Sequence, residues 1–258
     1  MYSADFFKVV EGAKKKRDFF HDNKKAYIMA AALAGMYVGL AIILAYTVGA
    51  KFNEAHSPAT KLVMGIVFSV ALVLVMFAGA ELFTGNNFVM TAGFLEKEVT
   101  KLDVIKIWGF SYLGNFIGSF VVAILFQMSG LNKGIVGEYM VEGALSKINV
   151  PIDQILVRGI LCNILVCLSV WCYIKMKDEG AKIIIIGLCL LVFVTSGFEH
   201  SIANMSLFMM GLFGDFKELM TVNSALTNIV FATIGNIIGG AVFVAMPYHL
   251  ISKTKIKK

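Results

Sequence analysis

Charged side chains are scarce in this sequence. Asp, Glu, Lys and Arg make up 16% of the 258 residues, whereas a soluble domain carries about 25%. The chain is 58% hydrophobic, its mean hydropathy is +0.79, and its charges fall in short clusters between long apolar runs. A helix needs about 20 apolar residues to cross a bilayer, and a membrane β-strand only about 10. We therefore predict an all-α integral membrane protein.

Proline and cysteine are also sparse. The three prolines are Pro58, Pro151 and Pro247, and none follows an asparagine. The paired Asn-Pro-Ala turns of aquaporins and glycerol channels are therefore missing. The four cysteines lie inside apolar runs without metal-ligand spacing, so we expect neither a metal site nor a cofactor.

The apolar runs predict six transmembrane spans, which places both termini on the same side of the membrane. Most of the 23 Lys and Arg residues precede the first span, separate the second from the third and the fourth from the fifth, or lie in the tail. Cytoplasmic loops carry such an excess, so both termini are expected in the cytoplasm and the protein in the plasma (inner) membrane. The spans are 26–50, 62–94, 104–130, 154–174, 183–213 and 224–251.

Two terminal segments flank the six-helix domain, which covers residues 26–251. Residues 1–25 combine charges with phenylalanines and are predicted to form a cytoplasmic amphipathic segment, and residues 252–258 a basic cytoplasmic tail. The cluster Lys14–Arg17 is interpreted as a topology signal at the lipid headgroups, so no nucleic-acid partner is expected.

Two of the spans, 62–94 and 183–213, are too long for one bilayer crossing. As continuous helices they would reach about 45–50 Å against a hydrocarbon core of about 30 Å. Each contains the motif Gly-x-Glu, with an Asn five residues after the Glu, where we expect the helix to break. The first break contains Gly79, Glu81 and Asn86, and the second contains Gly197, Glu199 and Asn204.

A second matched motif follows each break. Gly114-Asn115-x-x-Gly118 in the first half corresponds to Gly235-Asn236-x-x-Gly239 in the second. The halves, about 26–130 and 154–251, therefore form a tandem 3+3 repeat. Three helices per half invert the second half, and the broken helices of inverted repeats meet near the bilayer midplane and form the transport site. The three small-xxx-small pairs Gly35/Gly39, Gly114/Gly118 and Gly235/Gly239 predict close helix contacts, either within one subunit or between subunits.

The ionisable residues at membrane depth are Glu81, Glu199 and His200, and such residues usually mark functional sites. We expect the two carboxylates to accept hydrogen bonds from backbone N–H groups freed at the breaks. Asn86 and Asn204 are expected to bind freed carbonyl groups, in a structural role. His200 is predicted to line the pore and to supply a proton or a hydrogen bond to an anion. Thr84 is either a pore-wall residue or a helix cap.

The sequence from Gly197 to Met205, together with Gly79–Thr84 and Gly159–Asn163, resembles the paired signature of the formate/nitrite transporter family. The resemblance covers the whole chain. It implies an aquaporin-like six-helix fold, a homopentamer with one pore per subunit, and a lipid-plugged central hole. It also implies transport of small monovalent anions of weak acids: formate, nitrite or hydrosulfide. The turn Gly85-Asn86-Asn87 looks most like that of the hydrosulfide branch.

The resemblance also implies roles for individual residues. The family's pore has two apolar constrictions on either side of a central histidine, and charged residues guide ions at both mouths. The carried-over positions are Phe68, Val166 and Phe193 at the outer constriction, Leu82 and Phe83 at the inner one, His200 and Thr84 in the chamber, and Lys16 and Lys147 at the mouths.

Two other functions fit the sequence less well than an anion channel. An aquaporin-like channel for neutral solutes has the same architecture but needs the missing Asn-Pro-Ala turns. An intramembrane hydrolase using Ser196 or Ser201 with His200 would need an oxyanion site, and the chain has no Gly-x-Ser-x-Gly turn. We therefore expect no enzymatic activity.

Overall fold

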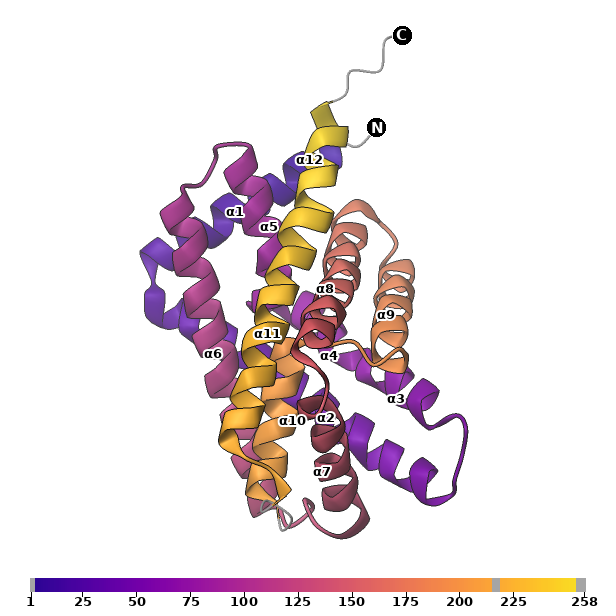
Figure 1. Ribbon diagram of the computed structural model, residues 1–258. Helices are drawn as coiled ribbons and strands as arrows, with labels where there is room; N and C mark the ends of the chain where they lie inside the picture. The colour runs from indigo at the N-terminus through magenta and orange to yellow at the C-terminus, as the bar shows by residue number, and fades with distance from the viewer. Residues whose placement is uncertain (1–2, 215–218, 254–258) are drawn as a thin grey trace.

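The computed structural model describes residues 3–214 and 219–253 (Figure 1), and its elements in these ranges are all helical. Lys217 and the part of the predicted basic tail from residue 254 onward lie outside the described residues. The elements are α1 (Ser3–Asp22), α2 (Lys24–Glu54), α3 (Thr60–Phe68), α4 (Val70–Leu74), the π-helix η1 (Val75–Gly79), α5 (Phe83–Leu95), α6 (Lys101–Met128), α7 (Gly134–Ile148), α8 (Ile152–Lys175), α9 (Glu179–Thr195), α10 (Ser201–Phe213), α11 (Val222–Gly240), the π-helix η3 (Ala241–Ala245) and α12 (Met246–Lys253).

Five helical segments of the described chain are long and apolar enough to cross a membrane, which confirms the prediction of an all-α membrane protein. A sixth, shorter apolar helix is α10. The long segments are Lys24–Glu54, Thr60–Gly79, Lys101–Met128, Ile152–Lys175 and Val222–Lys253.

The two overlong runs are interrupted at the predicted motifs. The first run ends its helix at Gly79 and resumes at Phe83, and the second ends at Thr195 and resumes at Ser201. Gly79 and Gly197 have φ angles of +83° and +74°. A side chain is strained in this left-handed region, so glycine is the residue that allows the chain to turn out of each helix.

Glycines also set how closely the long helices approach. A Cβ on Gly35 would collide with the backbone of Asn115, and one on Gly118 would collide with the carbonyl oxygen of Ala32, so α2 and α6 touch through their backbones. Gly235 meets Leu156 in the same way between α11 and α8. These motifs therefore act within one subunit, which settles the alternative left open by the sequence.

The contact at Gly118 yields a stability prediction. Gly118→Ala should destabilise the protein by about 1–3 kcal/mol, because the added methyl group overpacks a backbone contact. The matched control is Gly109→Ala on the same helix, where a Cβ meets nothing within 4 Å and higher helix propensity should stabilise by up to about 1 kcal/mol. Thermal unfolding in detergent, followed by tryptophan fluorescence, measures both. Equal melting temperatures for the two variants would contradict the packing argument.

The N-terminal helix α1 is docked onto the helical body. The apolar side of this amphipathic helix is buried in a second hydrophobic cluster with α5, α6, α8 and η3. Figure 1 shows α1 at the same end of the molecule as α12, the C-terminal helix of the described chain. The buried residues of α1 are Phe6, Val9, Val10, Ala13 and Phe20.

Candidate functional site

Each helix break is held by one buried asparagine from a distant helix. At the first break, Asn115 of α6 accepts a hydrogen bond from the N–H of Phe83 (2.9 Å). Its Nδ2 donates to the carbonyl oxygens of Ala31 (2.7 Å) and Glu81 (2.9 Å). One amide thereby satisfies two backbone groups that the break leaves without helical partners, the N–H of Phe83 and the carbonyl of Glu81, and joins them to α2 through the Ala31 carbonyl.

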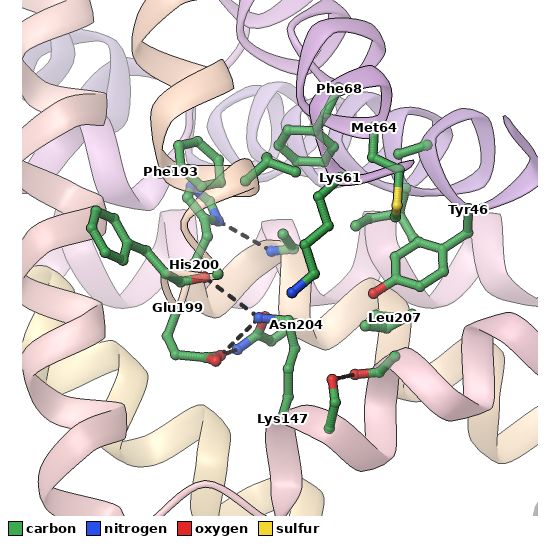
Figure 2. Close-up of a pocket in the computed structure, with 18 of the residues that line it drawn as sticks. Tyr46, Lys61, Met64, Phe68, Lys147, Phe193, Glu199, His200, Asn204 and Leu207 are labelled. Atoms are coloured by element: carbon green, nitrogen blue, oxygen red, sulfur yellow. Dashed lines mark hydrogen bonds and ion pairs between the residues drawn. The ribbon is translucent and has the colours of Figure 1, made fainter. Parts of the chain in front are cut away.

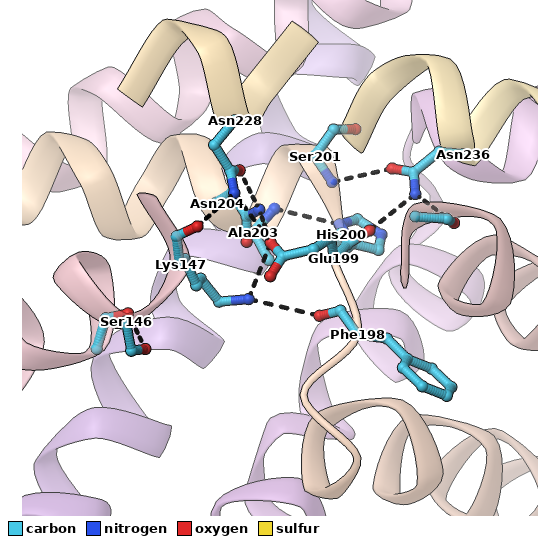
Figure 3. Close-up of polar contacts among 12 residues, drawn as sticks. Ser146, Lys147, Phe198, Glu199, His200, Ser201, Ala203, Asn204, Asn228 and Asn236 are labelled. Atoms are coloured by element: carbon cyan, nitrogen blue, oxygen red, sulfur yellow. Dashed lines mark hydrogen bonds and ion pairs between the residues drawn. The ribbon is translucent and has the colours of Figure 1, made fainter. Parts of the chain in front are cut away.

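The second break has the same construction (Figure 3). Asn236 of α11 accepts from the N–H of Ser201 (2.9 Å) and donates to the carbonyl oxygens of Gly159 (2.8 Å) and Glu199 (2.9 Å). The prediction that the Glu carboxylates accept from the freed N–H groups is therefore wrong. The asparagines of the second matched motif do this instead, because an amide can both donate and accept.

The carboxylate of Glu81 binds side chains. Both of its oxygens accept from Lys16 Nζ (2.7 and 2.8 Å). Its Oε2 also accepts from the Tyr27 hydroxyl (3.0 Å) and from Asn86 Nδ2 (3.1 Å). Asn86 also donates to the Tyr27 hydroxyl (3.2 Å). Asn86 was predicted to bind a freed carbonyl group, and that prediction is wrong, since both of its donor contacts go to side chains.

The carboxylate of Glu199 has an equivalent environment. Its Oε2 accepts from Lys147 Nζ (3.1 Å) and from Asn204 Nδ2, and Lys147 also donates to the carbonyl of Phe198 (3.4 Å). Asn204 Nδ2 reaches Asn228 Oδ1 (2.8 Å) and no freed carbonyl. The two residues predicted at the pore mouths, Lys16 and Lys147, thus each lie against the carboxylate of one break.

Asn163 of α8 is a further polar residue at the centre, for which the sequence suggested no role of its own. It is fully buried, and its Nδ2 lies 3.2 Å from the Thr84 carbonyl, 3.0 Å from Asn87 Oδ1 and 2.6 Å from the Asn236 carbonyl. Asn163 therefore joins the backbones of the two halves. Its place in the Gly159–Asn163 motif was the available signal.

His200 connects the two breaks directly. It is the N-cap residue of α10, and its Nδ1 accepts from the N–H of Ala203 (3.1 Å). Because Nδ1 accepts, the neutral ring carries its hydrogen on Nε2, which lies 3.1 Å from Thr84 Oγ1. Thr84 Oγ1 is the acceptor of that contact. Thr84 is not the cap of α5, since the N-cap position there is Leu82.

Aromatic rings surround His200. The Phe193 ring is stacked on the imidazole, with centroids 5.9 Å apart and an interplanar angle of 19°. The Phe68 ring meets Phe193 edge-on at 5.7 Å. These three side chains lie between two cavities, and they line both.

The smaller cavity measures about 10 Å³, which is close to the space of one water molecule. His200 is the only polar side chain in its wall. The lining residues are Val38, Phe68, Ala71, Leu72, Leu82, Val166, Leu190, Phe193 and His200. Five predicted pore residues therefore come together here, namely Phe68, Leu82, Val166, Phe193 and His200.

Two predicted pore residues lie outside this wall. The ring of Phe83 packs on Tyr112 with centroids 4.9 Å apart, and Thr84 is fully buried behind His200. The larger cavity, of about 380 Å³, opens beside His200 and is lined mainly by residues of α2, α3 and α7 (Figure 2). Among the residues that the structure describes, no group of three or more His, Cys, Asp or Glu is placed to hold a metal ion.

Comparison with known proteins places these features in context. The family model "Formate/nitrite transporter" matches residues 4–250. The nitrite transporter NirC of Escherichia coli (strain K12) is 40% identical over 229 residues, covering 88% of this chain and 84% of the relative. A solved "FNT family ion channel" is 34% identical with a TM-score of 0.91, covering 96% of this chain and 98% of that one. A "Pentameric formate channel with formate bound" is 29% identical with a TM-score of 0.77, covering 89% and 97%.

Proposed function

This chain belongs to the formate/nitrite transporter family, and we propose that it conducts small monovalent anions of weak acids through a pore in each subunit of a homopentamer. The observation that carries the proposal is the small apolar cavity with a single polar side chain, His200, between the two helix breaks. Relatives named for nitrite and formate transport support the substrate class.

The apolar wall explains why weak acids suit this pore. A bare anion would lose its water in a cavity of about 10 Å³ and would find hydrogen bonds only at His200, which makes its entry costly. The protonated, neutral acid avoids most of that cost. An anion that takes a proton from water at one mouth and returns it at the other therefore crosses with a lower barrier, and an anion that stays charged depends on the hydrogen bond to His200.

His200 fits the role of a hydrogen-bond donor. Its Nδ1 is engaged by the N–H of Ala203, so protonating that nitrogen would break the cap of α10. The hydrogen on Nε2 faces Thr84 Oγ1. An anion in the chamber can compete with Thr84 for this hydrogen and be stabilised without receiving the proton.

Among the family's ions we propose hydrosulfide as the preferred one. The resemblance of the turn Gly85-Asn86-Asn87 to the hydrosulfide branch supports this choice.

The membrane arrangement we propose is the inverted 3+3 repeat with broken second and fifth helices. Support comes from Asn115 and Asn236, which make the same kinds of hydrogen bond to the backbone of their breaks. The Lys–Glu–Asn contacts of the two breaks also match. The lysine-rich loops on the side of the termini support a cytoplasmic location for both ends in the plasma (inner) membrane. The likeness to a pentameric channel over 89% of this chain supports the homopentamer.

Flux into proteoliposomes tests the proposed function. Purified protein should carry hydrosulfide, formate and nitrite at rates well above those of protein-free vesicles, with hydrosulfide fastest and chloride slowest. Water permeability should remain at the level of protein-free vesicles. Fast water flux without anion flux would instead support the alternative, an aquaporin-like channel for neutral solutes.

A further inference from the structure

The larger cavity is the vestibule through which ions would reach His200, and its wall carries both signs of charge. Beside the aromatic and thioether side chains of Tyr46, Tyr139 and Met64, it exposes three cationic and two acidic residues. The charged residues of the wall are Lys61, Lys147, Arg158, Glu142 and Glu199.

Two of the three cations already have partners. Lys147 forms an ion pair with Glu199 (3.1 Å) and donates to the carbonyl of Phe198, so most of its charge is compensated. The guanidinium of Arg158 donates to Gln154 Oε1 (3.2 Å) on the exposed side of α8. Lys147 is therefore not free to hold an incoming anion without giving up a contact, and Arg158 is engaged toward Gln154 on the exposed side of α8.

Lys61 differs from both. Within residues 3–214 and 219–253, its ammonium group forms neither an ion pair nor a side-chain hydrogen bond, whereas Lys147 and Arg158 each form at least one such contact. It occupies the first turn of α3, which contains no acidic residue and where the helix dipole disfavours a cation. Figure 2 shows its side chain extending into the cavity, with Nζ at the open centre.

The helix that carries Lys61 also leads to the chamber. Lys61, Met64 and Phe68 all line the vestibule, as expected for positions i, i+3 and i+7 on one face of a helix. Phe68 also lines the small cavity. Seven residues of helix place Lys61 about 10 Å above Phe68. The Thr195 hydroxyl donates to the Lys61 carbonyl (3.4 Å) and fixes this end of α3 to α9.

We propose that Lys61 is an anion-capture residue of the vestibule, distinct from Lys147. Its ammonium group binds the incoming monovalent anion by charge-assisted hydrogen bonds. This raises the local concentration of the anion about 10 Å along α3 from Phe68, at the entrance to the chamber. The inference rests on the proposed function, because it assigns a step to that transport.

Flux kinetics test the assignment. Lys61→Gln should raise the half-saturating formate concentration about 3- to 10-fold at low ionic strength, since one unit charge in contact with an ion contributes on this scale. The maximal flux should stay unchanged, and the difference should shrink in several hundred millimolar inert salt, where screening lengths fall to a few ångströms. Lys61→Arg should retain the wild-type value.

The matched control is Lys51→Gln, which removes the same charge from an exposed position on α2 that does not line the cavity. It should leave the half-saturating concentration unchanged. The inference would be overturned if the wild type conducts and the Lys61→Gln and Lys51→Gln variants have equal half-saturating concentrations. It would also be overturned if Lys61→Gln lowers the maximal flux but leaves the half-saturating concentration unchanged, because that result indicates a structural role for Lys61. Absence of flux in the wild type would instead remove the proposed function.

Discussion

His200→Asn is expected to lower anion flux about tenfold or more. Asparagine is a good helix N-cap, so it can still accept from the N–H of Ala203 and preserve the start of α10. Its shorter side chain does not reach Thr84 or present a donor at the position of Nε2. A hydrogen bond to a charged group contributes about 1.5–3 kcal/mol, which corresponds to the expected loss when the anion crosses the apolar chamber.

Flux of hydrosulfide and formate into proteoliposomes between pH 5 and 8 measures the effect. His56→Asn is the matched control: His56 is exposed in the loop after α2 and has a φ of +50°, a conformation that asparagine tolerates. This control should conduct at the wild-type rate. If a correctly folded His200→Asn variant conducts like the wild type across this range, His200 has no role in passage.

Asn236→Leu is expected to cause the largest loss of stability. The substitution keeps the side-chain size but leaves two buried backbone groups of the break without partners, the N–H of Ser201 and the carbonyl of Glu199, and it removes the contact to the Gly159 carbonyl within α8. Each unsatisfied group costs about 1–3 kcal/mol. A total of about 2–6 kcal/mol is comparable with the lower end of protein stabilities, about 5 kcal/mol, so the yield of folded protein should fall strongly.

The measurement is the yield of monodisperse protein in detergent and its melting temperature. Asn53→Leu provides the control, since Asn53 is exposed on α2 and its side chain makes no hydrogen bond within the described part of the chain. Normal recovery of Asn236→Leu with an unchanged melting temperature would show that the second break does not depend on this amide.

The sequence located both helix breaks because their cause is local. A hydrophobic run longer than the bilayer must turn, and Gly79 and Gly197 are the residues that permit the observed positive φ angles. The partners of the breaks were not local. Asn115 lies 32 positions from Phe83 and Asn236 lies 35 from Ser201, so only the packing of α6 and α11 brings them there.

The carboxylates were assigned the wrong partners for a related reason. Glu81 and Glu199 are adjacent to the freed N–H groups in sequence, which made them the obvious acceptors. Their side chains turn instead to lysines from α1 and α7, where charge pairing is stronger than a bond to a neutral amide. The sequence predicts no role for Lys61, because it does not reveal the cavity that this residue lines.

The remote origin of the asparagines bears on how the chain is inserted during synthesis. The polar backbone of the first break finds its acceptor only when α6 has entered the membrane, and that of the second break only when α11 has entered. Until then each re-entrant half-helix would present bare amides to lipid, which the bilayer does not tolerate. The second break is therefore completed only when α11 arrives with Asn236.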